Sequence, residues 1–254
     1  MSIKISDLSF RYSQKQSLIL NNINIELVDG ETVAILGASG SGKSTLFNII
    51  TSLYKPTKGQ IKFGNSKLLD LAYIRQSAMD MVFPWKTVVE NINFALKERK
   101  ILNSKSIKKV KKLLDILRLT KRKNYYPNQL SGGELKRLSF ACGLSYSPKI
   151  LLLDEAFAGV DLSLKLELWS FLKNEIYTNK ITTIVISHDF DEAIFLADRI
   201  VFLDQTGTIF SKQILINKKL KESNKSIENY FSKLEIVEIK KDAIETFRKL
   251  NKND

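Results

Sequence analysis

Residues 32–45 read TVAILGASGSGKST, and this stretch decides the fold expected for the chain. The run TVAIL is short, apolar and rich in β-branched residues, which is typical of a strand buried on both faces of a parallel sheet. The segment GASGSGKST (37–45) fits the pattern G-x-x-x-x-G-K-[ST], and a helical pattern begins at Lys43. A strand, a glycine-rich loop and a helix in this order predict a loop that wraps around nucleotide phosphates.

The residue types in this loop suit phosphate binding. Glycines allow the backbone to approach the phosphates closely, with the N–H groups turned inward. We expect Lys43 to reach the β- and γ-phosphates, Ser44 to bind Mg²⁺, and the Thr45 hydroxyl to contact the α-phosphate. The predicted nucleotide-binding residues are Gly37, Ala38, Ser39, Gly40, Ser41, Gly42, Lys43, Ser44 and Thr45.

Three further segments have the same continuous apolar pattern, namely ILLLD (150–154), ITTIVIS (181–187) and RIVFL (199–203). Helical patterns begin near Leu164 and Asp189, so strands and helices alternate along the chain. This alternation predicts an α/β core with a mainly parallel sheet, whose ligands bind at the carboxyl ends of the strands.

Other segments depart from this core pattern. Residues 22–27 and part of 4–10 alternate apolar and polar side chains, which predicts an antiparallel β subdomain. From about 77 to 149 helical periods replace the strand patterns, so we expect an α-helical subdomain inserted in a core domain of residues 1–210. Residues 211–254 are polar and lysine-rich, and we expect a partly helical extension there.

Polar residues follow two of the predicted buried strands. Asp154 ends one strand, where its carboxylate suits a Mg²⁺ site, directly or through water. Glu155 comes next and could orient or deprotonate an attacking water, which favours ATP hydrolysis over transfer to a bound substrate. A lone histidine is usually structural, but His188 follows a strand that delivers it to the same edge as Gly37 and Asp154. We therefore expect His188 to contact the γ-phosphate.

Tyr12, in the segment LSFRY, could stack its ring on adenine. The alternative is that Tyr12 packs in the core as a strand aromatic and that Phe10 stacks on the base instead.

The segment LSGGELKR (130–137) resembles a second anion-binding helix start. Ser131, Gly132 and Gly133 precede a helical pattern, and their backbone N–H groups together with the helix dipole would suit an anion. Taken alone, the segment indicates no more than a capped helix, with Ser131 as the cap.

Composition narrows the functional classes. The chain has 254 residues, one cysteine, one histidine and a net charge of +13. These counts exclude a disulfide framework and a zinc cluster, and the apolar runs are far shorter than the roughly 20 residues of a membrane span. The densest basic cluster, 105–123, has apolar residues at helical spacing and predicts an amphipathic helix with a solvated basic face. We therefore expect a cytosolic protein that does not have nucleic acid as its main ligand.

These motifs, in this order, resemble the ATP-binding subunits of ABC transporters over about residues 3–205. In that family 37–45 corresponds to Walker A, 150–155 to Walker B and 130–137 to the signature motif. The single matched residues are Gln76 for the Q-loop, Asp161 for the D-loop and His188 for the switch.

The resemblance implies a P-loop NTPase fold and a head-to-tail dimer with two ATP molecules at its interface. It implies that Gln76 joins the Mg²⁺ site and that Lys43, Gln76, Glu155 and His188 form the catalytic set. It further implies an adenine contact from Tyr12. The residues expected to contact the ATP held by the other subunit are Ser131, Gly132, Gly133 and Asp161.

Two stretches are similar to the importer subgroup for nitrate, sulfonates and taurine, namely FPWKTVVENI (83–92) and SHDFDEAIFLADRI (187–200). That resemblance implies membrane permease subunits docked near Gln76, Pro84 and Trp85, a solute-binding protein outside the cell, and a peripheral position on the cytoplasmic face of the membrane. The alternative for Pro84 and Trp85 is an ordinary turn with a buried aromatic side chain.

Two departures from the family pattern stand out: EAFAGVD lacks a proline common in the subgroup, and Glu134 replaces a frequent glutamine.

Alternative functions are an exporter or lipoprotein-release ATPase, and a soluble ABC-type ATPase in cofactor assembly or nucleic-acid transactions. An ATPase subunit need not contact the transported solute.

Overall fold

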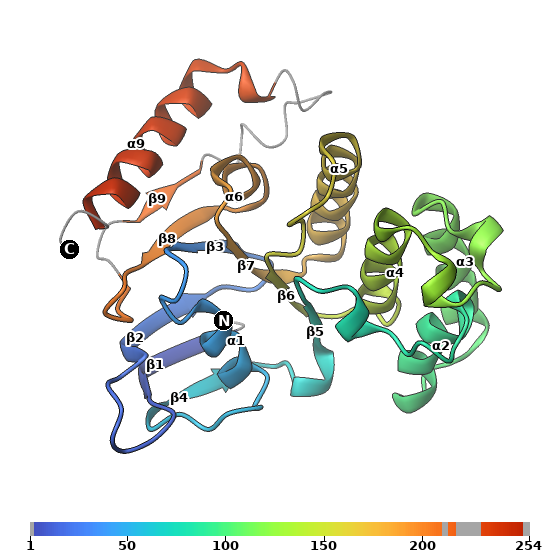
Figure 1. Ribbon diagram of the computed structural model, residues 1–254, viewed down its shortest axis with the longest axis horizontal. Coiled ribbons are helices and arrows are strands. Elements are labelled where there is room, and N and C mark those ends of the chain that lie inside the picture. The colour runs from blue at the N-terminus through green and yellow to red at the C-terminus, as the bar shows by residue number, and fades with distance from the viewer. Residues whose placement is uncertain (1–2, 210–212, 217–229, 251–254) are drawn as a thin grey trace.

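The structure is a computed structural model that describes residues 3–209, 213–216 and 230–250. Its centre is a six-stranded sheet with the order β5-β6-β7-β3-β8-β9 (Figure 1). The pairs from β5 to β8 are parallel, and β9 pairs antiparallel to β8. The strands are β3 (Thr32–Gly37), β5 (Leu71–Ile74), β6 (Ile150–Asp154), β7 (Thr182–Ser187), β8 (Arg199–Leu203) and β9 (Ile214–Leu215).

The α/β fold expected from the sequence is confirmed. The four continuous apolar runs form β3, β6, β7 and β8, and all their apolar side chains are buried. In β3, Val33 and Ile35 face a core shared with the antiparallel strands, whereas Ala34 and Leu36 face a core shared with the covering helices. Burial on both faces explains why these strands have no alternating polar residues.

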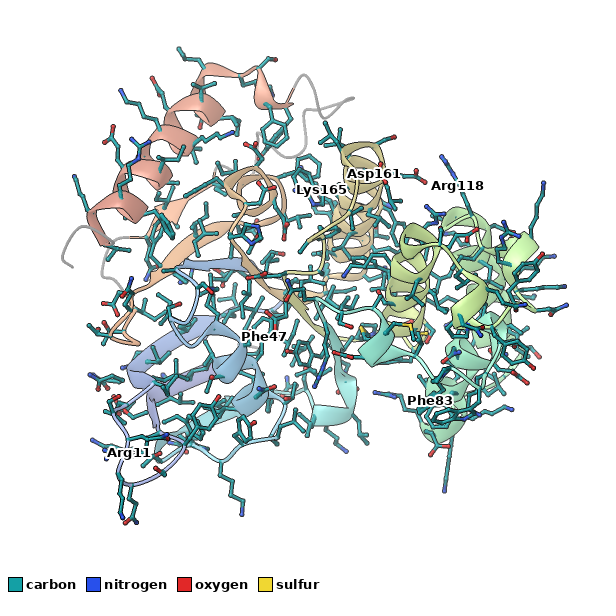
Figure 2. All side chains as sticks on the ribbon, viewed as in Figure 1. Arg11, Phe47, Phe83, Arg118, Asp161 and Lys165 are labelled. Atoms are coloured by element: carbon teal, nitrogen blue, oxygen red, sulfur yellow. The ribbon has the colours of Figure 1, made fainter. Side chains whose placement is uncertain are left out.

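A second, three-stranded sheet has the order β2-β1-β4, with both pairs antiparallel. Its strands are β1 (Ile3–Phe10), β2 (Leu20–Leu27) and β4 (Lys58–Phe63). The antiparallel pairing of the first two was predicted, and burial along β2 alternates as its sequence does. Phe47, from helix α1 (Lys43–Ile50), is fully buried in the core between the two sheets (Figure 2).

Residues 79–144 contain helices and no strand. The long helices are α2 (Val88–Glu98), α3 (Ser104–Ile116) and α4 (Gly132–Leu144), which form a lobe beside the sheet (Figure 1). The basic cluster 105–123 was predicted to be a single amphipathic helix, but α3 ends at Ile116 because Arg118 adopts a left-handed φ of 55°. The other lysines of α3 are exposed, but Lys109 is half-buried and its Nζ donates to Ser147 Oγ at 2.7 Å, whereas Val110, Leu113 and Leu114 are buried.

The remaining helices cover the sheet: α5 (Leu162–Asn179), α6 (Phe190–Leu196) and α9 (Leu234–Leu250). Helix α9 packs on α6 through an edge contact between Phe247 and Phe190, and through the ion pair of Lys240 with Asp191 at 2.7 Å. The helix lies within residues 211–254, where the sequence predicted a partly helical extension. Within the described segments, no helix is both long and apolar enough to cross a membrane.

Candidate nucleotide-binding site

The glycine-rich loop joins the end of β3 to α1. Gly42 caps the helix with φ 93°, and Gly40 has φ 83°, so both adopt a backbone conformation that other residues rarely take. A Cβ on Gly37 would lie 2.5 Å from the Leu203 carbonyl oxygen, and one on Gly42 would lie 2.9 Å from that of Ile19. The loop therefore keeps its shape only with glycine at these two positions.

Lys43 lies across this loop. Its Nζ donates to the carbonyl oxygens of Gly37 at 2.8 Å and Ala38 at 2.6 Å, and the residue is 7% exposed. Burial lowers the pKa of Lys43, while the charges of Glu155 and Asp154 oppose that shift. The ammonium group is thus held at the loop, on the side that faces the two carboxylates.

Asp154 lies at the end of β6 and is 8% exposed. Its Oδ2 accepts a hydrogen bond from the Tyr73 hydroxyl at 2.8 Å, and its Oδ1 accepts one from Ser44 Oγ at 3.3 Å. Burial raises the pKa of Asp154, and the two hydrogen bonds oppose this. Tyr73 lies on β5, a strand that the sequence analysis did not identify, so its contact with the site was missed.

The Ser44 hydroxyl and the Asp154 carboxylate fit the hard oxygen ligands that Mg²⁺ prefers at nucleotide sites, where phosphates and water complete the coordination. Among the residues that the structure describes, no cluster of three or more His, Cys, Asp or Glu side chains could hold a metal ion. A Mg²⁺ ion here would therefore depend on the nucleotide for most of its ligands.

Glu155 and His188 lie together beyond the strand ends. His188 Nδ1 is 3.6 Å from Glu155 Oε2, and the His188 side chain is 67% exposed. Glu155 has a φ of 44°, and its N–H donates to the Ile186 carbonyl at 2.9 Å, which fixes it beside β7. The exposure of His188 excludes a buried structural histidine, the alternative for this residue.

Tyr12 follows β1 and is 54% exposed. Its hydroxyl lies 3.0 Å from Thr45 Oγ1, and its ring makes edge contacts with Phe10 and Tyr54. Phe10 is 6% exposed and stacks on Tyr54, so Phe10 belongs to the core and Tyr12 does not. Tyr54, 40% exposed, is a second aromatic residue at this edge that the sequence analysis missed.

Gln76 is exposed just after β5. Its backbone carbonyl accepts a hydrogen bond from Lys136 Nζ at 2.8 Å, which ties α4 to this segment. Nearby, Trp85 is 69% exposed and lies 5.4 Å from the ring of Phe83 at the edge of the helical lobe (Figure 2). An ordinary turn with a buried tryptophan is therefore wrong for this segment.

Ser131 caps α4 as its sequence predicted, with its Oγ accepting from the Glu134 N–H at 3.2 Å. Ser131 and Gly132 are exposed, and Gly133 is half-buried. These residues begin a helix of the lobe, apart from the loop at Gly37 (Figure 1). Asp161 caps α5 by accepting from the Leu164 N–H at 3.0 Å.

The geometry of this site is that of a P-loop nucleoside triphosphatase. Its glycine-rich loop holds a buried lysine, and the aspartate at the end of β6 is bonded to Ser44 and followed by a glutamate. Residues 20–158 match the protein-family model for ABC transporters. This chain therefore belongs to the ABC transporter family and is one of its ATP-binding, ATP-hydrolysing proteins.

Curated relatives agree with this membership. The probable sulfate/thiosulfate import ATP-binding protein CysA of Chlorella vulgaris is 39% identical over 211 residues, which are 80% of this chain and 88% of that protein. The trimethylamine N-oxide transport system ATP-binding protein TmoW of Pelagibacter ubique is 40% identical over 196 residues, which are 72% of this chain. The matched part is 57% of TmoW and 61% of CysA 1 from Agrobacterium fabrum, so the chain spans about three-fifths of these longer relatives.

Two solved structures are similar over most of the chain. The dimeric ATP-binding cassette MJ0796, in a post-hydrolysis state with ADP and Pi, aligns with a TM-score of 0.74 at 27% identity, covering 85% of this chain and 99% of that one. CbiO1 of Clostridium perfringens, part of the ABC transporter complex cbiONQ, aligns with a TM-score of 0.75 at 27% identity, covering 92% and 96%.

Two buried charged residues beside this site were not predicted. Glu192, in α6, is 3% exposed, and its Oε1 has no hydrogen-bond partner among the described residues. Burial, with the charge of Asp189, raises the pKa of Glu192 to about 8. Lys136 is 4% exposed, and burial lowers its pKa to about 8 while Glu192 opposes the shift. No periodic pattern in the sequence marks either residue.

Glu192 gives a prediction for stability against pH. The folded-state pKa of about 8 exceeds the ordinary value of 4.5, so between these values unfolding releases a proton, and stability falls as pH rises. Between about pH 5 and pH 8 the free energy of unfolding, measured in urea, should fall for both proteins. We expect the fall to be smaller by at least about 1 kcal/mol for Glu192→Gln than for the parent. Glu238→Gln, on an exposed position of α9, is the control and should follow the parent. If the free energy of unfolding changed with pH in the same way for all three proteins, the raised pKa of Glu192 would be contradicted.

Proposed function

We propose that the chain is the ATP-hydrolysing subunit of an ABC importer and couples hydrolysis to uptake of a small solute through separate permease subunits. The observation that carries the chemical part is the grouping of Lys43, Asp154, Glu155 and His188 at one edge of the sheet. The relatives named as import ATP-binding proteins support the importer assignment.

ATP binding would use the loop 37–42 for the phosphates, with Lys43 near the β- and γ-phosphates and Thr45 near the α-phosphate. Lys43 already lies against the carbonyl groups of the loop, and a bound phosphate would offer it a charged partner. Mg²⁺ held by Ser44 and Asp154, with Gln76 nearby, would supply charge neutralisation of the phosphates.

Hydrolysis would use the carboxylate that follows this site. Glu155 would orient a water molecule and accept its proton as the water oxygen bonds to the γ-phosphorus. The bond from that phosphorus to the bridging oxygen of ADP breaks in the same displacement. His188, within 3.6 Å of Glu155 and exposed, would contact a γ-phosphate oxygen.

We propose that the site is completed by a second copy of the chain. Ser131 and Gly132 are exposed at a helix start, where N–H groups suit an anion, Gly133 follows half-buried, and Asp161 caps the neighbouring α5. In a head-to-tail dimer these residues would contact the ATP bound at the partner's loop. The dimeric cassette MJ0796 with ADP and Pi supports this arrangement.

The permease subunits would dock near Gln76, Pro84 and Trp85. Trp85 is exposed, and its neighbour Phe83 is held by a hydrogen bond from its N–H to Asn91 Oδ1 at 2.7 Å, so the segment is a fixed apolar feature on the surface. The chain would then lie on the cytoplasmic face of the membrane, in a system that also has an extracytoplasmic solute-binding protein.

The solute class is proposed broadly. Residues 83–92 and 187–200 suggested the nitrate, sulfonate and taurine subgroup, whereas the relatives reported above carry the names of sulfate/thiosulfate and trimethylamine N-oxide systems. We therefore propose import of a small inorganic or organic solute, of which the nitrate, sulfonate and taurine class is one case. Export and soluble cofactor or nucleic-acid roles have no support among these names.

Glu155→Gln tests the chemistry. The amide keeps the shape of the side chain but cannot accept the proton, so we expect ATP hydrolysis to fall by about a hundredfold or more while ATP still binds. Size-exclusion chromatography with Mg²⁺ and ATP should show a stable dimer. A variant that stays monomeric with ATP and hydrolyses it at the parental rate would contradict both the role of Glu155 and the completed site.

Tyr12→Ala tests the adenine contact. Loss of a stacking partner worth about 1–3 kcal/mol should raise the Kd for ATP by about tenfold, measured by titration calorimetry. Tyr54→Ala, which removes the neighbouring exposed ring, is the matched control and should have a smaller effect. A larger effect of Tyr54→Ala would assign the base contact to Tyr54 instead.

A further inference from the structure

The start of α4 has an ion pair that the proposed mechanism does not use. Glu134, the third residue of the helix, accepts a hydrogen bond from the Ser131 N–H at Oε2 with a length of 2.9 Å. Its other oxygen, Oε1, accepts one from Arg122 Nε at 2.8 Å. The Glu134 side chain is 16% exposed and that of Arg122 is 40% exposed.

The carboxylate lies where the proposed function places an anion. Ser131, whose N–H binds Glu134, is also the first of the residues expected to contact the γ-phosphate held by a second copy. The helix dipole and free N–H groups favour a negative group at this end, but a carboxylate at the same end repels it. Glu134 is ionised at neutral pH, because Arg122 and the Ser131 N–H hold its pKa below the ordinary value.

We propose that Arg122 neutralises Glu134 and thereby keeps the start of α4 able to accept the phosphate of the ATP bound by the partner copy. Arg122 belongs to the turn at 120–122 between α3 and α4, so it approaches the helix start from a different segment of the chain. Its guanidinium also lies 4.8 Å from the centre of the Tyr125 ring, which restricts its position further. This role rests on the proposed completion of the site by a second copy.

Arg122 is thus a positioning residue, which acts on the phosphate through Glu134. The competing explanation is a tether that merely joins the turn at 120–122 to α4. The two explanations differ when the charge of Glu134 is removed. Glutamine at position 134 can still complete the capping box with Ser131, but it has no charge to repel a phosphate. If Arg122 acts by neutralising Glu134, Glu134→Gln makes Arg122 dispensable. If Arg122 acts as a tether, adding Glu134→Gln does not repair the effect of losing Arg122.

The chain offers a matched control in Arg118 (Figure 2), which pairs with Glu167 at 3.2 Å. Arg118 follows α3, and Glu167 lies in α5, so this ion pair joins the helical lobe to α5 and does not involve the start of α4. Its side chains are 71% and 34% exposed.

The experiment measures ATP-driven dimerisation by analytical ultracentrifugation with Mg²⁺ and ATP, in the full chain with Glu155→Gln as background. We expect Arg122→Gln to raise the dimer Kd by about tenfold or more, and the double variant Arg122→Gln/Glu134→Gln to return to within about threefold of the background. Arg118→Gln should dimerise as the background does. The affinity of each monomer for ADP, which binds at the variant's own loop, should be unchanged and shows that each variant is folded.

A double variant as weak as Arg122→Gln alone would assign a tether and overturn the proposal. An Arg122→Gln protein that dimerises as well as the background would overturn it too. Both results leave the proposed function intact, since they require that the background dimerises. A background that does not dimerise with ATP would overturn the proposed second copy, and the role of Arg122 with it.

Discussion

The parallel pairing of β3, β6 and β7 brings the residues of the nucleotide site together. It places Leu36 opposite Ser187 and Ile186 opposite Asp154, so the three strands end at the same edge of the sheet. The phosphate-binding loop, the two carboxylates and the histidine each follow directly from one of those strand ends. Bringing these groups together costs little additional conformational entropy, because the buried strands are held on both faces by the two cores.

The same architecture joins the helical lobe to the segment that follows β5. The exposed helix start at Ser131 belongs to the lobe formed by α2, α3 and α4. Lys136 of that lobe donates part-buried hydrogen bonds to the carbonyls of Arg75 at 3.2 Å and Gln76 at 2.8 Å. The segment at Gln76 is thus tied to the lobe at whose edge Trp85 is exposed. This geometry suits a protein that passes a nucleotide-dependent movement to another subunit.

The nucleotide loop and the strands around it could be predicted from the sequence, because burial on both faces and phosphate binding both demand distinctive local patterns. Other features depended on tertiary contacts. The strand β4 is polar and pairs with β1 mainly through its backbone, and β5 has only four residues. Tyr73 bonds to Asp154, 81 residues away, Arg122 reaches Glu134 from the turn before α4, and Glu192 matters because the fold buries it. Local spacing could not predict the bonds to those partners.

In the proposed dimer, each catalytic site is built from two copies of the chain. The initial rate of ATP hydrolysis tests this arrangement when it is measured against protein concentration, in a range where sedimentation shows that the chain is mainly monomeric. A site completed by a second copy predicts a rate that rises with the square of the concentration. A rate that stays proportional to concentration throughout that range, at an undiminished turnover per chain, would contradict the account.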